Sequence, residues 1–201
     1  MKISGRRITF SKILNELDKL ALEFTGILAR NRVRYAVVSG YVAILFGRNR
    51  SSEDVDIICE KVGYERFSRL WREVNRRMEC VITSDRRSAY EDYLLKGTAL
   101  RFARKGTFIP NIELKFANSD LHVAALKKPV EVRVNRLTLH ISPLEQQIAY
   151  KLYLGSEKDI EDARFMFALF RDHLSLAEVE RLLKGMRIPL GRAKKFLGWQ
   201  E

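Results

Sequence analysis

The chain has 201 residues, 46% of them hydrophobic and 31% charged, and its 37 Lys and Arg against 25 Asp and Glu give a net charge of +12. These values are typical of a globular protein that buries roughly 70% of the surface its unfolded chain exposes. No apolar run approaches the roughly 20 residues that a membrane helix needs, and the segment Met1–Arg7 lacks the apolar core of a signal peptide. We therefore expect a cytoplasmic protein without a membrane partner.

The basic residues are spread along the whole chain rather than gathered in a tail. A strongly positive balance favours a polyanionic partner, with nucleic acid first and a nucleoside triphosphate second. A basic, solvated surface without a specific partner is the alternative. Cys59 and Cys80 belong to no motif with metal-binding or redox spacing, so we expect both to be reduced core residues.

Apolar periodicity predicts an α/β region at the start of the chain. In chain order we expect a helix over about 11–30, a strand over 35–38, a helix over 42–47, a strand over 54–59, a helix over 64–77, a strand over 80–83, a helical segment over 90–96, strands over 99–103 and 111–116, and a hairpin of 130–134 and 137–141. Asn135-Arg136 is the expected turn of this hairpin.

Two helix starts follow the hairpin. The segment Ser142-Pro143-Leu144-Glu145 combines a capping serine, a proline at the first helical position and a glutamate three residues after the cap. Gly155 is a typical helix stop, and Ser156 is a typical cap for the next helix. We therefore predict an α+β fold in which residues 1–141 form a core with a mixed sheet flanked by helices, and residues 142–201 form a C-terminal helical bundle.

Asp54 and Asp56 lie two residues apart in an apolar strand, so their side chains project from one face. Two like charges about 4 Å apart repel by about 1 kcal/mol in water and by about 4 kcal/mol at a dielectric constant of ~20. A cation between the two carboxylates would turn this repulsion into attraction. The pair therefore predicts a metal site, although a solvated strand edge is the alternative.

Upstream of this pair, Ser39 and Gly40 lie between a strand and a helix. Glycine lets a backbone approach a phosphate closely, the helix N-terminus offers free N–H groups, and Ser39 adds a hydroxyl donor. Together with Glu113 on a later strand, Asp54 and Asp56 would hold one or two Mg²⁺ (or Mn²⁺) ions, which bridge triphosphate oxygens and polarise an attacking hydroxyl. Glu113 is expected to be a ligand, a general base or both, and a half-exposed strand glutamate is the alternative.

The stretch from Ser39 to Ile58 resembles the signature of the polymerase-beta-type nucleotidyltransferase superfamily, which pairs a Gly-Ser or Gly-Gly turn with an Asp-x-Asp strand and a third carboxylate on a later strand. Gly40-Tyr41 here replaces the usual pair, and Lys151 with the segment Lys158–Asp162 follows downstream. This form is similar to the AbiEii-like branch, the nucleotidyltransferase toxins of abortive-infection, type IV toxin–antitoxin systems. The resemblance extends from about Val33 to Phe170 and implies a nucleotidyltransferase-type mixed sheet.

The resemblance also implies roles around the phosphates. Ser39 and Gly40 would contact phosphate, and Tyr41 would do so only through its backbone N–H. Asp54 and Asp56 would bind Mg²⁺.

Three further residues gain implied roles in nucleotide binding. Arg50 would lie near the triphosphate or brace the two aspartates. Lys151 would hold the triphosphate and Asp159 would act near it, with Asp162 in support. Helix capping is an alternative for Asp159, and a solvent-facing position is an alternative for Lys151.

We therefore predict a metal-dependent nucleotidyltransferase that moves a nucleoside monophosphate from a nucleoside triphosphate to a hydroxyl. RNA, most plausibly a tRNA 3′ end, is the expected acceptor, and the toxin resemblance implies a cognate antitoxin as a further partner. A protein acceptor modified on Tyr, Ser or Thr is one alternative. A catalytically silent nucleic-acid- or partner-binding protein is another. His122, His140 and His173 lack partners at metal-ligand spacing, and we interpret them as structural.

Overall fold

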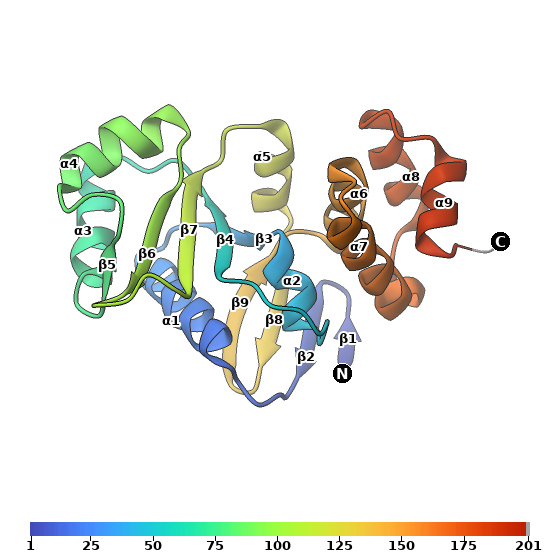
Figure 1. Ribbon diagram of the computed structural model, residues 1–201, viewed down its shortest axis with the longest axis horizontal. Helices are drawn as coiled ribbons and strands as arrows, with labels where there is room; N and C mark the ends of the chain where they lie inside the picture. Colours follow the sequence, from blue (N-terminus) through green and yellow to red (C-terminus); the bar gives the residue numbers. More distant parts are fainter. Residues whose placement is uncertain (200–201) are drawn as a thin grey trace.

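The computed structural model describes residues 1–199 (Figure 1). Its strands are β1 (Lys2–Ser4), β2 (Arg7–Phe10), β3 (Tyr35–Val38), β4 (Asp54–Cys59), β5 (Met78–Cys80), β6 (Leu100–Arg104), β7 (Asn111–Phe116), β8 (Val130–Val134) and β9 (Leu137–Ile141). Its helices are α1 (Glu16–Arg30), α2 (Gly40–Leu45), α3 (Tyr64–Val74), α4 (Arg86–Ser88), α5 (Asp120–Lys127), α6 (Leu144–Leu154), α7 (Glu157–Phe170), α8 (Leu176–Gly185) and α9 (Leu190–Leu197). Ala89–Tyr93 is a π-helical turn, and Leu94–Lys96 and Arg171–His173 are 3-10 turns.

The described strands form one mixed sheet in the order β1-β2-β8-β9-β3-β4-β7-β6-β5. The centre of the sheet positions the candidate site. There β4 runs antiparallel to β3 and parallel to β7, with Asp56 paired to Val38 on one side and to Glu113 on the other. The predicted α+β fold with a mixed sheet is therefore confirmed.

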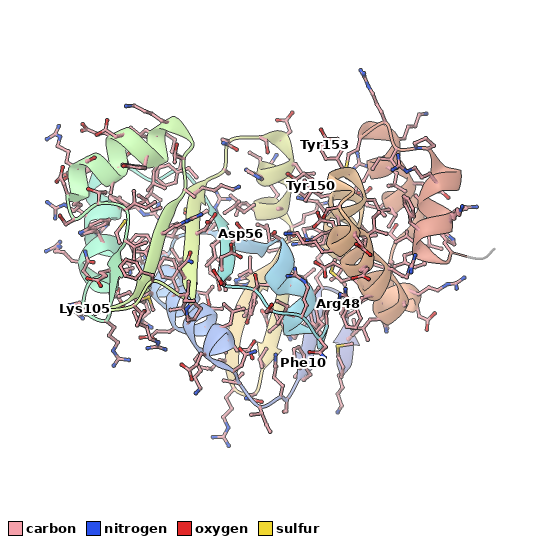
Figure 2. All side chains as sticks on the ribbon, viewed as in Figure 1. Phe10, Arg48, Asp56, Lys105, Tyr150 and Tyr153 are labelled. Carbon is pink, nitrogen blue, oxygen red and sulfur yellow. The ribbon has the colours of Figure 1, made fainter. Side chains whose placement is uncertain are left out.

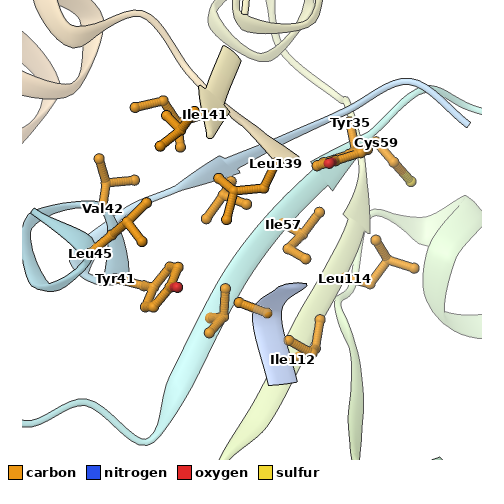
Figure 3. Close-up of a cluster of buried hydrophobic side chains, with 14 of the residues drawn as sticks. Tyr35, Tyr41, Val42, Leu45, Ile57, Cys59, Ile112, Leu114, Leu139 and Ile141 are labelled. Atoms are coloured by element: carbon orange, nitrogen blue, oxygen red, sulfur yellow. The ribbon is translucent and has the colours of Figure 1, made fainter. Parts of the chain in front are cut away.

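One face of the sheet carries the main hydrophobic core. Val55 and Ile57 of β4 are fully buried on this face, together with Ile112 and Leu114 of β7. Figure 3 shows Tyr41, Val42 and Leu45 of α2 packed beside side chains of β3, β4, β7 and β9. Burial of each large aliphatic side chain contributes roughly 1.5–3 kcal/mol, so this layer fixes where β3, β4 and β7 lie relative to one another.

The opposite face of the sheet is only partly covered. Ala36 and Ile58 form a small cluster there with Ala125 and Leu126 of α5. Because side chains alternate along a strand, Asp54 and Asp56 project from this same face. In Figure 1, α5 lies over the upper part of the central strands, between β7 and α6. The two aspartates therefore lie on the part of the sheet that α5 leaves open.

The C-terminal helices pack beside the sheet, with α6 against α7 and α8, and α7 also against α2 and α9. The helix start at Ser156 is confirmed, because its side chain accepts a hydrogen bond from the Asp159 N–H, and Gly155 ends α6 in the left-handed conformation. The predicted serine cap at Ser142 is wrong, since Pro143 is the N-cap residue and the Ser142 hydroxyl accepts a hydrogen bond from Gln147 instead. The division into two domains at residue 141 stays a prediction, and residues 200 and 201 lie outside the described chain.

The N-terminal region also differs from expectation. The first helix begins at Glu16 rather than near residue 11, because Asn15 and Asp18 form a reciprocal capping box. The short strands β1 and β2 and the helix α5 were not predicted. None of the described helices has both the length and the apolar character required to cross a membrane.

Candidate active site

A tight turn connects β3 to α2 at the centre of the sheet. Ser39 has a φ of 64° and a ψ of −147°, a conformation that costs a non-glycine residue free energy. A β-carbon on Gly40 would lie 2.1 Å from Nη2 of Arg50. Gly40 is therefore required by the guanidinium of Arg50, which packs directly against this turn.

Three carboxylates lie beside the turn, and we call them the carboxylate face: Asp54, Asp56 and Glu113. Asp56 and Glu113 are register partners in the parallel pair β4–β7, so their side chains project from the same face. All three residues are partly buried. The sequence prediction that Asp54 and Asp56 share one strand face is confirmed, and the structure also brings Glu113 beside them.

The electrostatics of the carboxylate face disfavour ionised Asp56. Burial raises the pKa of this carboxyl above its ordinary value, and the charges of Asp54 and Glu113 raise it further. A hydrogen bond from the Ser39 hydroxyl and the charge of Lys115 oppose this rise. The site thus holds more negative charge than its protein neighbours neutralise.

The other two carboxylates also have protein partners. Glu113 forms an ion pair with Arg101, whose Nη2 lies 2.6 Å from Oε1 of Glu113. Asp54 accepts a hydrogen bond of 3.0 Å from the Ser52 hydroxyl. Arg101 therefore holds the Glu113 side chain in place, whereas Asp54 retains oxygen lone pairs for a further partner.

The donor set of this face fits a hard divalent cation. Among residues 1–199, no three His, Cys, Asp or Glu side chains converge closely enough to form a complete metal cage. Mg²⁺ usually binds through one or two carboxylates plus substrate phosphates rather than through such a cage. Asn111, the register partner of Asp54, also has a buried amide oxygen without a hydrogen-bond partner in the described chain. Asp54 and Asp56 are therefore suited to hold Mg²⁺ together with phosphate oxygens.

A small pocket opens beside Asp56, between the sheet, α5 and α6. It has a volume of about 170 Å³, and its walls include Ser39, Asp56, Lys115, His122, Gln146 and Tyr150. Figure 2 labels Asp56 on β4 and Tyr150 on α6. The structure thus places a side chain of the carboxylate face in the wall of a pocket lined by both polar and apolar side chains.

His122 was interpreted as structural, yet it lines this pocket. Burial and the nearby charge of Lys115 lower the pKa of His122, so its imidazole is neutral at pH 7. The pocket residues of α5 and α6 were missed because α5 itself was not predicted. A Ser/Thr cap followed by an amphipathic run was the available signal, since Ser119 caps α5 through the N–H of His122.

The remaining predicted residues, Arg50, Lys151, Asp159 and Asp162, come together with Arg48 and Glu161 in a largely buried cluster that we call the ion-pair network. Asp162 is fully buried and accepts contacts from Arg50 at 2.9 Å and from Lys151 at 3.0 Å. Lys151 also lies 2.6 Å from Asp159.

The network links the loop before β4 to α6 and α7. The side chain of Lys151 is only 3% exposed, so it faces the protein interior rather than solvent. Asp159 combines a capping contact with Ser156 and the ion pair with Lys151. The structure therefore brings Lys151 and Asp159 to each other and joins them through Asp162 to Arg50, which packs against the Ser39–Gly40 turn.

Comparisons with known proteins define the fold. No protein-family model and no curated protein sequence matches the chain. Among solved structures, it is similar to an antigenic nucleotidyltransferase-like protein from Paracoccidioides brasiliensis, with a TM-score of 0.56, 18% identity and coverage of 91% of this chain and 92% of that one. The chain therefore has a nucleotidyltransferase-type fold.

A second similar protein is the antibiotic-resistance factor ANT(2″)-Ia. Its solution structure has a TM-score of 0.51 and 13% identity, covering 84% of this chain and 90% of that one. Its crystal structure in complex with adenylyl-2″-tobramycin has a TM-score of 0.51 and 15% identity, covering 84% and 95%. At such identities the likeness concerns the fold, which agrees with the superfamily that the sequence resembles.

Proposed function

We propose that the protein is a metal-dependent nucleotidyltransferase that transfers a nucleoside monophosphate from a nucleoside triphosphate to a hydroxyl acceptor. The observation that carries the proposal is the carboxylate face directly beside the Ser39–Gly40 turn. Asp54, Asp56 and Glu113 lie on one open sheet face, and the pKa of Asp56 is raised by burial and by the other two carboxylates. Binding of a cation lowers the electrostatic free energy of such a face.

Asp54 and Asp56 would hold Mg²⁺ or Mn²⁺, which supplies Lewis-acid stabilisation of the charge on the phosphate oxygens. Ser39 and Gly40 would approach the triphosphate through the turn. The guanidinium of Arg50 packs against Gly40 and adds a positive charge at that place. Lys151 and Asp159 would act indirectly, because they hold Asp162 and thereby the orientation of Arg50.

In the reaction, the acceptor oxygen forms a bond to the α-phosphorus while the bond from that phosphorus to the bridging oxygen breaks and pyrophosphate leaves. The acceptor hydroxyl loses its proton to Glu113, which then releases it to water. Arg101 keeps Glu113 in position through the ion pair at 2.6 Å. The chain therefore supplies orientation, charge and a proton acceptor.

RNA is the acceptor that we propose, in particular the 3′ end of a tRNA. The net charge of +12 favours a phosphodiester backbone over a neutral acceptor. The resemblance to AbiEii-like proteins adds the proposal that this activity serves as the toxin of a toxin–antitoxin pair. Both proposals go beyond the fold and are tested separately from the chemistry.

The test is a transfer assay with each of the four labelled ribonucleoside triphosphates, Mg²⁺ and total RNA. Asp56→Asn should lower the transfer rate by about 10²–10³-fold, whereas Asp172→Asn, which changes an exposed acid, should leave it unchanged. Transfer by Asp56→Asn at the wild-type rate would refute the assignment. Ribonuclease treatment separates the acceptors, because label on a protein survives it.

A catalytically silent protein is the remaining alternative. It predicts that calorimetry detects no Mg²⁺-dependent binding of a nucleoside triphosphate. The proposed enzyme predicts binding that requires both Mg²⁺ and the two aspartates.

A further inference from the structure

The pocket between α5 and α6 has a composition that the proposed phosphoryl chemistry does not use. Asp56 and Ser39 form the wall nearest the carboxylate face, whereas Gln146 and Tyr150 of α6 form the wall away from it. A molecule in this pocket therefore touches the proposed metal-binding side chain at one end. Its other end contacts groups that have no role in binding phosphate.

The size of the pocket restricts its occupant. Sites that enclose a drug-sized ligand typically have volumes of roughly 300–1,000 Å³. At about 170 Å³, this pocket is too small for a whole nucleotide or a sugar-based antibiotic. The pocket has room for one heteroaromatic ring system, with the attached sugar and phosphates outside it.

The polar groups of the pocket are fixed in place by the protein. Gln146 donates a hydrogen bond from Nε2 to the Leu121 carbonyl at 3.0 Å, and Gln147 donates one to the Ser142 hydroxyl at 2.6 Å. Both glutamine side chains are buried, so these tethers orient amide groups toward a restricted space. Preorganised amides suit the edge of a planar ring that carries both donors and acceptors.

An aromatic platform lies at the same pocket. Tyr150 and Tyr153 stack on each other on α6, with ring centroids 6.0 Å apart and an angle of 25° between the planes. Tyr150 is 37% exposed and lines the pocket, whereas Tyr153 is 58% exposed and is not part of the pocket wall. Figure 2 labels both residues on α6. An exposed aromatic ring next to a pocket with both polar and apolar walls is typical of sites that stack bases.

We propose that this pocket binds a nucleobase, stacked against Tyr150 and contacted at its edge by Gln146. The inference rests on the proposed function only in placing that base beside the reacting phosphates. The base belongs either to the nucleoside triphosphate or to the terminal nucleotide of the acceptor. Both sources present the same planar, hydrogen-bonding ring to the pocket.

The first test uses the four ribonucleosides without Mg²⁺, because a nucleoside carries no phosphate and needs no metal. Saturation-transfer NMR should show base protons close to the protein, and intermolecular Overhauser contacts should connect them to the Tyr150 ring. Ribose alone should show neither signal. Absence of nucleoside binding, or contacts that exclude Tyr150, would overturn the proposal.

Variants then measure the stacking contribution. Tyr150→Ala should weaken nucleoside binding roughly 5- to 150-fold, since base–aromatic stacking is worth ~1–3 kcal/mol. Tyr150→Phe should retain most of the affinity because it keeps the ring. Phe108→Ala removes a 77% exposed ring that does not line the pocket and should have no effect. Equal binding by Tyr150→Ala and the wild type would refute stacking on this residue.

Two further arms identify the source of the base. Calorimetry with a non-hydrolysable triphosphate analogue and Mg²⁺, and separately with a short RNA, should show the Tyr150→Ala defect in one of the two. Asp54→Asn should abolish transfer and leave nucleoside binding intact, since Asp54 does not line the pocket. If the wild type transfers nucleotides but does not bind nucleosides, only the pocket assignment is refuted. If the wild type binds nucleosides but does not transfer nucleotides, only the enzyme assignment is refuted.

Discussion

The carboxylate face and the ion-pair network are both rich in charged residues, but they differ in how far the protein itself neutralises their carboxylates. On the carboxylate face, three like charges share an open surface, and burial together with neighbouring carboxylates raises the pKa of Asp56. In the network, Asp162 is fully buried, and contacts with Arg50 and Lys151 neutralise it. On the carboxylate face Glu113 is paired with Arg101, and a bound cation can supply a counter-charge for Asp54 and Asp56, whereas the network already contains its own counter-charges.

The pKa of Asp162 illustrates this difference. Burial alone would raise its pKa, but hydrogen bonds from Arg50 and Lys151 lower it below its ordinary value. Charged residues in a conspicuous motif are thus not all ligand-binding groups. A charge that is already paired and buried holds the fold together, and a charge that is unpaired at a surface is available for chemistry.

Lys151→Met should give the largest effect, because it tests whether this lysine serves the fold or the ligand. It leaves Asp159 without its cationic partner and removes one of the cations that contact the buried Asp162, and breaking a buried ion pair typically costs about 3–5 kcal/mol. For a chain of this size, each kcal/mol lowers the melting temperature by roughly 2–4 °C. Calorimetric melting should therefore show a fall of about 6–20 °C.

The matched control is Lys195→Met, which removes an exposed lysine of α9 and should change stability by no more than about 0.5 kcal/mol. If Lys151→Met melted like the wild type and only bound triphosphate more weakly, Lys151 would be a direct ligand. That result would remove the difference between the two regions.

Asp56→Asn tests the other region and should change activity rather than stability. Loss of one charge-stabilising group at a reacting centre typically lowers kcat by about 10²–10³-fold. Stability should be unchanged or higher, because the substitution removes a carboxylate that burial and two like charges disfavour. Melting and transfer rates measured on the same preparation check both statements, and a strongly lowered melting temperature would contradict them.

The sequence predicted the central strands well because their signals are local. A short apolar run defines β3, alternation of apolar and charged residues defines β4 and β7, and the turn at Asn135-Arg136 defines the β8–β9 hairpin. The placement of Asp54 and Asp56 on one face follows from that alternation alone. Glu113 needed the register between β4 and β7, which no single strand reveals.

The ion-pair partners of the predicted basic residues, Arg50 and Lys151, could not be predicted from the sequence. Arg50 and Asp162 are separated by 112 positions in the chain, and nothing local signals their contact. Lys151 and Asp159 lie eight positions apart across the helix stop at Gly155, so helical spacing does not pair them either. The motif named these residues as candidates, while packing decided which of them face solvent.

Gly40→Ala tests the point where the two regions meet. The new methyl group would lie 2.1 Å from Nη2 of Arg50, so the guanidinium must move from Asp162 or the turn must shift. Such overpacking typically costs about 1–3 kcal/mol. Urea unfolding should show this loss, together with weaker triphosphate binding.

Two comparisons show whether the loss arises from Arg50. Gly191→Ala adds a methyl group that meets nothing within 4 Å, so it should not destabilise the protein. In an Arg50→Ala background, the cost of Gly40→Ala should largely disappear, because the clashing side chain is gone. An equal cost in both backgrounds would mean that the turn itself, rather than Arg50, excludes a side chain.

The smallest effect is a pH dependence of opposite sign in the two regions. Asp56 has a raised pKa, so above the ordinary aspartate pKa of about 4 the unfolded chain loses this proton first, and the wild type loses stability as pH rises toward the raised value. Asp159 and Asp162 have lowered pKa values, so their contribution is present above about pH 4 and is lost as pH falls through those values.

Melting temperatures measured against pH for the wild type, Asp56→Asn and Lys151→Met separate these contributions. The advantage of Asp56→Asn over the wild type should grow as pH rises from about 4, and Mg²⁺ should reduce that advantage because a cation compensates the charge of Asp56. The deficit of Lys151→Met should shrink as pH falls below about 4, since protonated carboxyls no longer need the lysine. Curves that stayed parallel for all three proteins would show that neither region carries the charge imbalance assigned to it.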